Sequence, residues 1–208
     1  MWTSTDGRAW ELIQSEAFDA GHVTDAATDG ERIVVTGEIG DLLLELGGEG
    51  RGAMWTSTDG RVWEVVEPDG PIPEYLEWTA NGWIGVRNTR ALEGTYYVDA
   101  GPEFLASSDG LRWEVVTEGG ALGRGRVADL AVDLTGTTAI AVGYHEMVSE
   151  AGLLESGSGV AWRTRDGRSW EGAPDQQSLV STGPGGLYLQ SVTATDDGWL
   201  GVGRADDA

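Results

Sequence analysis

The fold is decided by the opening stretch MWTSTDGRAWE (residues 1–11), which returns almost unchanged as MWTSTDGRVWE (54–64). Two more divergent copies follow, LASSDGLRWE (105–114) and WRTRDGRSWE (162–171). Their common core is Ser/Thr-x-Asp-Gly-x-x-Trp-Glu. It recurs about every 50 residues, a period typical of β-propellers and related repeat folds. Glycine accounts for 33 of 208 residues and no window shows a helical stripe, so an all-β fold is expected.

Each copy predicts a β-hairpin that turns at its Asp-Gly pair. Glycine supplies the positive φ of the turn, and the aspartate accepts hydrogen bonds from backbone N–H groups two residues on. The tryptophan four residues after the aspartate is expected to point into the core. We therefore interpret these residues as structural rather than as metal ligands. They are Asp6, Trp10, Asp59, Trp63, Asp109, Trp113, Asp166 and Trp170.

A second repeated element lies between the copies. It consists of two short β-rich runs around a glycine turn, at residues 23–37, 76–86, 127–143 and 190–203. This A–B hairpin and the following C–D hairpin of the motif together predict one four-stranded antiparallel blade. Whole blades are expected at 22–67, 75–117 and 127–172. A fourth is expected from the hairpins at 189–203 and 1–14. The sequence therefore predicts one domain over 1–208, a β-propeller of about four blades.

The fourth blade can close in two ways. Closure within one chain gives a monomer, which we favour because Met1 and Ala208 would then flank a dispensable loop position. Exchange of hairpins between two chains gives a dimer of about eight blades. A third alternative is that the chain is a piece of a larger propeller.

Charge and composition restrict the partners. Asp and Glu number 35 and the basic residues 13, which gives a formal net charge of −22. Such a surface repels phosphate backbones and anionic lipids, so neither nucleic acid nor membrane is an expected partner. No apolar run of about 18 residues and no signal-peptide pattern is present. Because there is no cysteine, disulfides and thiolate metal sites are excluded. The compartment stays undetermined.

The motif resembles the Asp-box, or BNR repeat, of sialidase-like β-propellers, commonly written Ser-x-Asp-x-Gly-x-x-Trp. Here the glycine follows the aspartate directly. In that family the box is a structural staple in the C–D turn, remote from any active site. Members range from sialidases to glycan binders and receptors, which also implies an extracellular or cell-envelope location. The resemblance covers essentially the whole chain.

Sialidase chemistry in that family needs an arginine triad, a Tyr–Glu pair and an aspartic acid, with the first arginine in an Arg-Ile-Pro motif. That motif is absent; the nearest string is 32–34, which lacks the proline. Arg90, Glu93, Tyr96 and Tyr97 are close in sequence, but a Tyr–Glu pair must also meet in space. The sequence therefore favours a protein without enzymatic activity.

Two places are candidates for binding. The B–C connections, at 38–53, 88–103 and 145–159, mix acids with apolar residues on one face, where loops commonly bind ligands; alternatively they form extra strands. Aligning the A strands also places four side chains at one channel-lining position: Asp25, Glu77, Asp129 and Ser191. Converging oxygens suit Ca²⁺, and converging carboxylates raise one another's pKa. The alternative, which we favour, is that each bonds to the backbone of the neighbouring blade. No other cofactor is expected.

These observations favour a non-catalytic propeller that binds a protein, peptide or glycan on its loop-rich face. A sialidase-like glycoside hydrolase is the first alternative. The second is a truncated piece of a larger propeller with no independent activity.

Overall fold

The computed structural model describes residues 1–40, 51–93, 96–118, 121–148, 154–173, 179 and 186–205. Its strands are β1 (Trp2–Thr3), β2 (Glu11–Leu12), β3 (Gly21–Thr28), β4 (Ile33–Ile39), β5 (Arg51–Ser57), β6 (Glu64–Val66), β7 (Tyr75–Thr79), β8 (Gly82–Glu93), β9 (Tyr96–Ser107), β10 (Glu114–Thr117), β11 (Arg126–Val132), β12 (Ala139–Val148), β13 (Leu154–Thr164), β14 (Trp170–Gly172), β15 (Leu187–Thr195) and β16 (Gly198–Ala205). One 3₁₀ turn, η1 (Glu16–Phe18), precedes β3. None of the helical segments described is long and apolar enough to cross a membrane.

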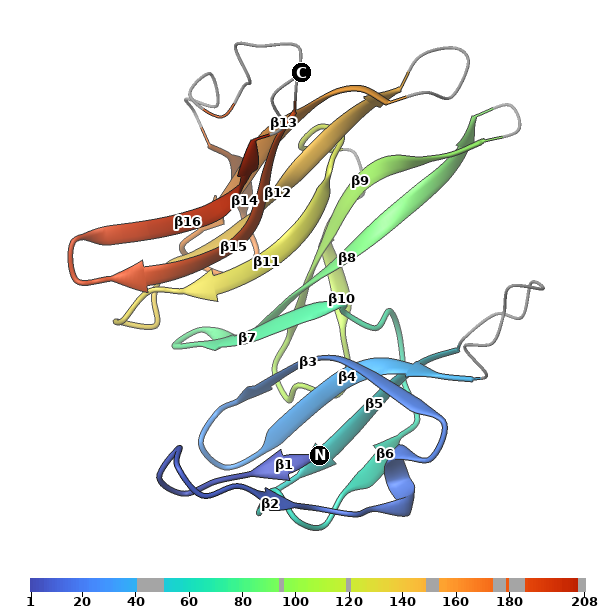
Figure 1. Ribbon diagram of the computed structural model, residues 1–208, viewed down its shortest axis with the longest axis vertical. Coiled ribbons are helices and arrows are strands. Elements are labelled where there is room, and N and C mark those ends of the chain that lie inside the picture. The colour runs from blue at the N-terminus through green and yellow to red at the C-terminus, as the bar shows by residue number, and fades with distance from the viewer. Residues whose placement is uncertain are drawn as a thin grey trace.

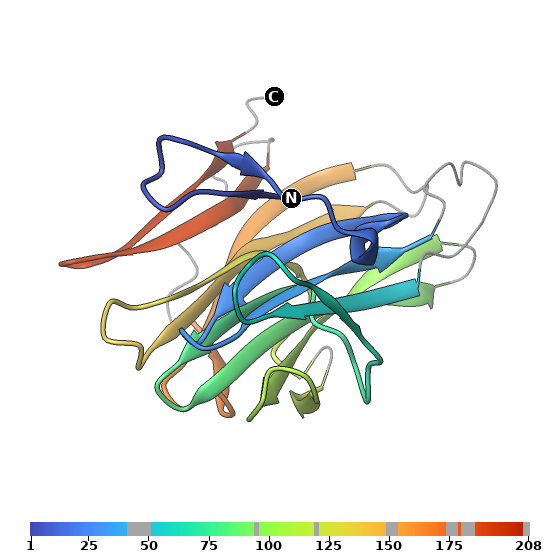
Figure 2. The same ribbon diagram turned by 90° about the horizontal axis from the view of Figure 1, so that it is seen from below.

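Three four-stranded antiparallel sheets form the body of the molecule. They are consecutive meanders in the orders β3-β4-β5-β6, β7-β8-β9-β10 and β11-β12-β13-β14. Figures 1 and 2 show them following one another along the chain, from the blue sheet through the green one to the yellow and orange one. The first strands of successive sheets, β3, β7 and β11, contact one another and are innermost. The expected all-β class and antiparallel four-stranded sheets are therefore confirmed.

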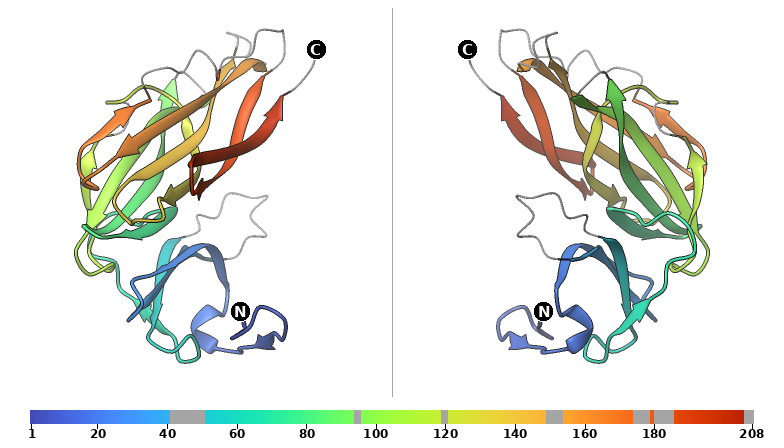
Figure 3. Two further views of the ribbon diagram at one scale, coloured as in Figure 1. Left: turned by 90° about the vertical axis from the view of Figure 1, so that its left-hand side faces the viewer. Right: turned by 90° about the vertical axis from the view of Figure 1, so that its right-hand side faces the viewer.

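The predicted fourth blade is wrong for the part of the chain that the structure describes. β1–β2 and β15–β16 each form a two-stranded sheet of their own. β15 packs against the third sheet, whereas β1–β2 lies beyond the first sheet, at the opposite end of the array (Figure 3). Arg61 of the first sheet forms an ion pair with Glu11 of β2, and Phe18 of η1 stacks on Trp55, so β1–β2 is held at the first sheet and away from β15–β16. The residues that the structure describes thus do not form a closed ring.

Each interface between neighbouring sheets is filled by a separate hydrophobic cluster. The cluster between the first and second sheets contains Val34, Met54, Leu76, Trp83, Leu105 and Trp113. The one between the second and third contains Ile84, Val86, Phe104, Val127, Leu130, Ala139, Ala141, Trp162 and Trp170. In it, the ring of Phe104 stacks on Trp170 with centroids 4.1 Å apart. A third cluster on the outer face of the first sheet is covered by Phe18 of η1, which stacks on Trp55.

The four motif copies adopt one turn geometry. In the third copy, the Oγ of Ser107 accepts a bond of 2.9 Å from the N–H of Gly110, and an Oδ of Asp109 accepts two more, from the N–H groups of the next residues. Equivalent bonds from backbone N–H groups lower the pKa of Asp6, Asp59 and Asp166. In each turn, one oxygen of the aspartate thus accepts two bonds from backbone N–H groups.

The motif tryptophans do not all lie in the core. Trp63, Trp113 and Trp170 are buried, but the side chain of Trp10 is 60% exposed. The expectation for Trp10 is therefore wrong. Its indole N–H still donates to the carbonyl of Gly7 at 3.3 Å, so the turn is intact. The difference is that none of the other described sheets covers the β1–β2 hairpin.

Substitution of Gly110 by alanine is expected to destabilise the fold more than the equivalent substitution of Gly7. Both glycines have a φ near +70°, so both variants carry the same backbone strain. A Cβ at Gly110 would lie 2.9 Å from the ring of Trp83, whereas at Gly7 it would meet nothing within 4 Å. Urea unfolding should therefore show an additional loss of about 1–3 kcal/mol for Gly110→Ala. Equal losses would contradict the packing of this turn against the neighbouring strand.

Candidate functional site

The innermost strands β3, β7, β11 and β15 bring the predicted channel residues to one region, but in a different register from the one expected. In each of the three sheets, one residue lies four positions before the motif aspartate. It pairs with Val35 in the first sheet, with Gly85 in the second and with Ala141 in the third. These three pair in turn with Ala26, Leu76 and Leu130 of the innermost strands. The residue before each of these is Asp25, Tyr75 and Asp129. Glu77 is therefore displaced by two residues from the position assigned to it.

The displacement has a simple cause in the A–B turns. Between the equivalent pairs Thr28–Ile33 and Trp78–Trp83, both turns contain four residues, but the turn glycine is the second of them in one (Gly30) and the fourth in the other (Gly82). Counting back from the turn glycine therefore places Glu77 two residues out of line. In the true register Glu77 corresponds to Ala27 and Ala131, both small residues.

Asp25 and Asp129 hold neighbouring innermost strands together. One carboxylate oxygen of Asp25 accepts a 2.9 Å bond from the N–H of Leu76, on the next sheet. In the same way, Asp129 accepts from the N–H of Val192 at 2.8 Å and from the hydroxyl of Ser191 at 2.6 Å. The other oxygen of each aspartate accepts from the N–H of the following residue. Asp25, Asp129 and Ser191 thus make the inter-sheet bonds that were the alternative to a binding role.

Glu77 differs from these two aspartates. Its half-buried carboxyl is near the charges of Asp25 and Asp129, and no bond to another sheet is found for it in the described residues. Burial, and then the charge of Asp25, raise the pKa of Glu77 to about 7, against the opposing effect of the N–H of Trp78. Burial also raises the pKa of Tyr75, two residues earlier on the same strand. Glu77 is therefore partly protonated at neutral pH.

No group of three or more His, Cys, Asp or Glu side chains within the described ranges is arranged to hold a metal ion. The oxygens of Asp25 and Asp129 are directed at N–H donors rather than at a common point. The geometry therefore adds no support to the calcium expectation, which stays a prediction.

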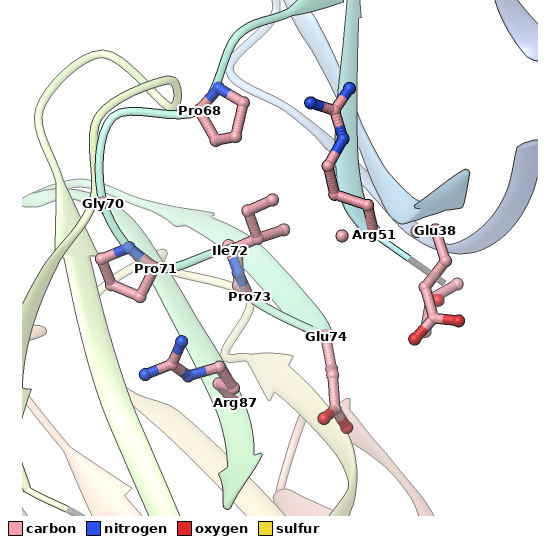
Figure 4. Close-up of a pocket in the computed structure, with 12 residues that line it drawn as sticks. Glu38, Arg51, Pro68, Gly70, Pro71, Ile72, Pro73, Glu74 and Arg87 are labelled. Atoms are coloured by element: carbon pink, nitrogen blue, oxygen red, sulfur yellow. The ribbon is translucent and has the colours of Figure 1, made fainter. Parts of the chain in front are cut away.

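A cavity of about 360 Å³ lies between the first and second sheets. Figure 4 shows the proline-rich segment 68–73 along one side of it, Arg51 and Glu38 on the opposite side, and Glu74 and Arg87 below. Arg87 is paired with Glu103. Thr24 and Glu74, which directly precede Asp25 and Tyr75, also line the cavity. The cavity therefore lies beside the middle of β3 and the start of β7, and neither Asp25 nor Glu77 is among the residues that line it.

The expected B–C loops are mostly strand. Positions 88–93 and 96–103 continue β8 and β9, and the ends of 145–159 continue β12 and β13. The residues 41–50 and 149–153 of these connections lie outside the described residues. The aromatic and β-branched run at 96–98 explains the extension, because these residue types favour strands. Across the β8–β9 pair, Glu93 is opposite Tyr96 and Leu92 is opposite Tyr97.

No family model and no curated protein matches the chain. Among solved structures, it is similar to a glycosyl hydrolase from Bacteroides ovatus (TM-score 0.46, 12% identity, 90% of this chain and 62% of that one). It is also similar to a putative glycosidase from Bacteroides thetaiotaomicron (TM-score 0.48, 14% identity, 90% of this chain and 63% of that one). A third similar structure is a GH32 β-fructofuranosidase from Bombyx mori (TM-score 0.43, 14% identity, 74% of this chain and 36% of that one). The chain thus spans less than two thirds of the length of these proteins.

These similarities correct one expectation. The neighbours are described as glycoside hydrolases and, for the GH130 family, as mannoside phosphorylases that include glycoside hydrolases. These descriptions contradict the expectation of a non-catalytic binding module, which is not kept. The neighbours named here are not described as Asp-box proteins, so they give the Asp-box resemblance no direct support.

Proposed function

We propose that this chain contributes the acid–base carboxyl groups of a glycoside-cleaving enzyme, with Glu77 as the proton donor. The observation that carries the proposal is the carboxyl group of Glu77. It lies on an innermost strand where the corresponding residues of neighbouring sheets are the small Ala27 and Ala131. The fold does not need a carboxyl group there, and this one is held partly protonated at neutral pH.

Cleavage of a glycosidic bond needs this kind of pair. A carboxylic acid with a raised pKa protonates the leaving oxygen, while a second, ionised carboxylate stabilises the oxocarbenium-like transition state or activates water. In our proposal Glu77 gives its proton to the glycosidic oxygen and the C–O bond breaks. Asp25 supplies the second negative charge. Both of its oxygens accept from backbone N–H groups, so in our proposal it stabilises the transition state through its charge and does not act as nucleophile or base. Thiol chemistry is excluded by the lack of cysteine.

Glu77 and Asp25 do not line the cavity between the first two sheets, so we propose that this cavity holds a part of the glycoside away from the bond that is cleaved. Glu38, Glu74 and Arg51 offer acceptors and a donor to sugar hydroxyl groups, and Ile72 offers an apolar surface. A sialoside would need several arginines at its carboxylate. Of the two arginines lining this cavity, Arg87 is already neutralised by Glu103. A neutral glycoside therefore fits the cavity better.

The proposal predicts glycoside cleavage with a rate that falls as the pH rises past about 7. The purified protein should release 4-nitrophenol from at least one member of a panel of 4-nitrophenyl glycosides that includes a mannoside and a sialoside. Because Glu77 must be protonated, kcat/KM should fall as the pH rises through about 7. Reactions with and without inorganic phosphate separate hydrolysis from phosphorolysis. No release from any glycoside, or no fall in rate between about pH 6 and 8, would refute the proposal.

A further inference from the structure

The two terminal hairpins expose the side chains that their counterparts bury. Trp2 and Trp10 are each 60% exposed, whereas the residues at the same places in the second motif copy, Trp55 and Trp63, are 0% and 7% exposed. On β16, Leu200 is 54% exposed, whereas the corresponding Ile84 of β8 is 1% exposed. The outer edge of β16 and one edge of β1 are also unpaired among the described residues. Both hairpins are therefore halves of the same repeating sheet.

The halves are complementary. β15–β16 has the place of the first two strands of a sheet, and β1–β2 has the place of the last two, because it carries the Asp-Gly turn that joins those strands elsewhere. We propose that β1–β2 of one copy of this chain pairs with β16 of a second copy and completes a four-stranded sheet.

The three complete sheets fix the register of this contact. In each of them, the residue three positions before the motif aspartate pairs with a residue of the second strand. That partner is Val34 in the first sheet, Ile84 in the second and Ile140 in the third. The equivalent pair is Thr3 with Leu200, and the next one is Trp2 with Gly201. The second sheet already pairs a glycine with a large residue at that point, since Gly85 is opposite Leu105.

A second copy, rather than the same chain, is the partner because β1–β2 is fixed at the far end of the array. Arg61 of the first sheet forms a 2.7 Å ion pair with Glu11 of β2. The segment that follows is held by a 2.5 Å bond from the indole N–H of Trp55 to the carbonyl of Ala17. Figure 1 shows β1–β2 and β15–β16 at opposite ends of the molecule. Two copies that exchange both hairpins form a ring of about eight sheets, which is within the usual range for propellers.

The net charge of −22 opposes this association, so salt should promote it. Light scattering in increasing NaCl, from about 0.05 to 0.5 M, should show the mass rising from 22.0 kDa towards twice that value. A mass that stays at one chain throughout would overturn the proposal and would indicate that another partner covers these edges.

Cysteine cross-linking tests the register, because the native chain has no cysteine. The variants Thr3→Cys and Leu200→Cys are purified separately, mixed in about 0.5 M NaCl and mildly oxidised, so that only a contact between copies can join them. We expect a mixed disulfide at least about ten times more abundant than with the control mixture of Ser4→Cys and Leu200→Cys, whose side chains point to opposite faces. Equal yields from both mixtures would overturn the proposal. So would an intrachain disulfide in the Thr3→Cys/Leu200→Cys double variant.

Discussion

Replacement of Glu77 by glutamine is expected to lower kcat/KM for glycoside cleavage by about 10²–10⁴-fold, the usual contribution of a general acid. Glutamine has nearly the same shape but cannot release a proton. Because the proton transfer belongs to the chemical step, kcat should fall more than KM changes. The basic limb of the pH profile near 7 should disappear from any residual activity, since Glu77 is the group whose pKa is raised to that value.

The matched control is Glu64→Gln, because Glu64 is an exposed glutamate on the outermost strand β6. It should leave both the rate and the pH profile unchanged. Full activity in the Glu77→Gln variant would remove Glu77 from the mechanism.

The same variant should also change how stability depends on pH. A carboxyl group whose pKa is higher in the folded than in the unfolded state stabilises the fold while it is protonated. The contribution of Glu77 is therefore complete below its usual pKa of 4.5 and is lost as the pH rises through about 7. In urea unfolding, the variant should lose less stability across this window than the native protein. Part of the fall in stability with rising pH should remain in the variant, because burial also raises the pKa of Asp25.

Replacement of Trp113 by alanine is expected to lower the free energy of unfolding by about 3–5 kcal/mol, as for other large buried aromatic side chains. Trp113 is 5% exposed and packs between the first and second sheets. The substitution leaves a void that neighbouring strands cannot close without losing their register, and it removes the 3.1 Å bond from the indole N–H to the carbonyl of Gly110. Urea unfolding followed by circular dichroism measures the loss.

Trp10→Ala provides the comparison, since Trp10 has the same place in the motif and the same bond to a turn carbonyl, but is exposed. At low salt, where we expect single chains, its effect should lie within about 0.5 kcal/mol of zero. Similar losses in both variants would show that the turn, and not the packing between sheets, is the source of the stability.

The sheets could be predicted from the sequence because each depends on local signals. The Asp-Gly turns fix the outer hairpins, and the β-rich runs around glycine fix the inner ones. Ring closure could not be predicted in this way. It depends on the angle between successive sheets, which is set by how side chains such as Phe104 and Trp170 fill the interface, and a repeat period does not contain that angle.

For a similar reason, only part of the candidate site could be predicted from the sequence. Asp25, Asp129 and Ser191 could be matched because their strands share a β-bulge just before these residues. No such bulge is found in β7, and its turn glycine is placed two residues later in the turn, so Glu77 was assigned to the position that Tyr75 occupies. The cavity beside it could not be foreseen, because it forms where segment 68–73 crosses from one sheet to the next.

The separate hydrophobic clusters also bear on how the chain folds. Each is shared only by adjacent sheets, and each sheet is a meander of consecutive strands. The molecule therefore behaves as a linear array in which the stability of the whole is close to a sum of unit and nearest-neighbour terms. Folding can begin at any one sheet and spread to the next. A destabilising substitution in the third sheet should then leave the first sheet and its contact with η1 folded. The result would be a partly folded state at equilibrium with the native one.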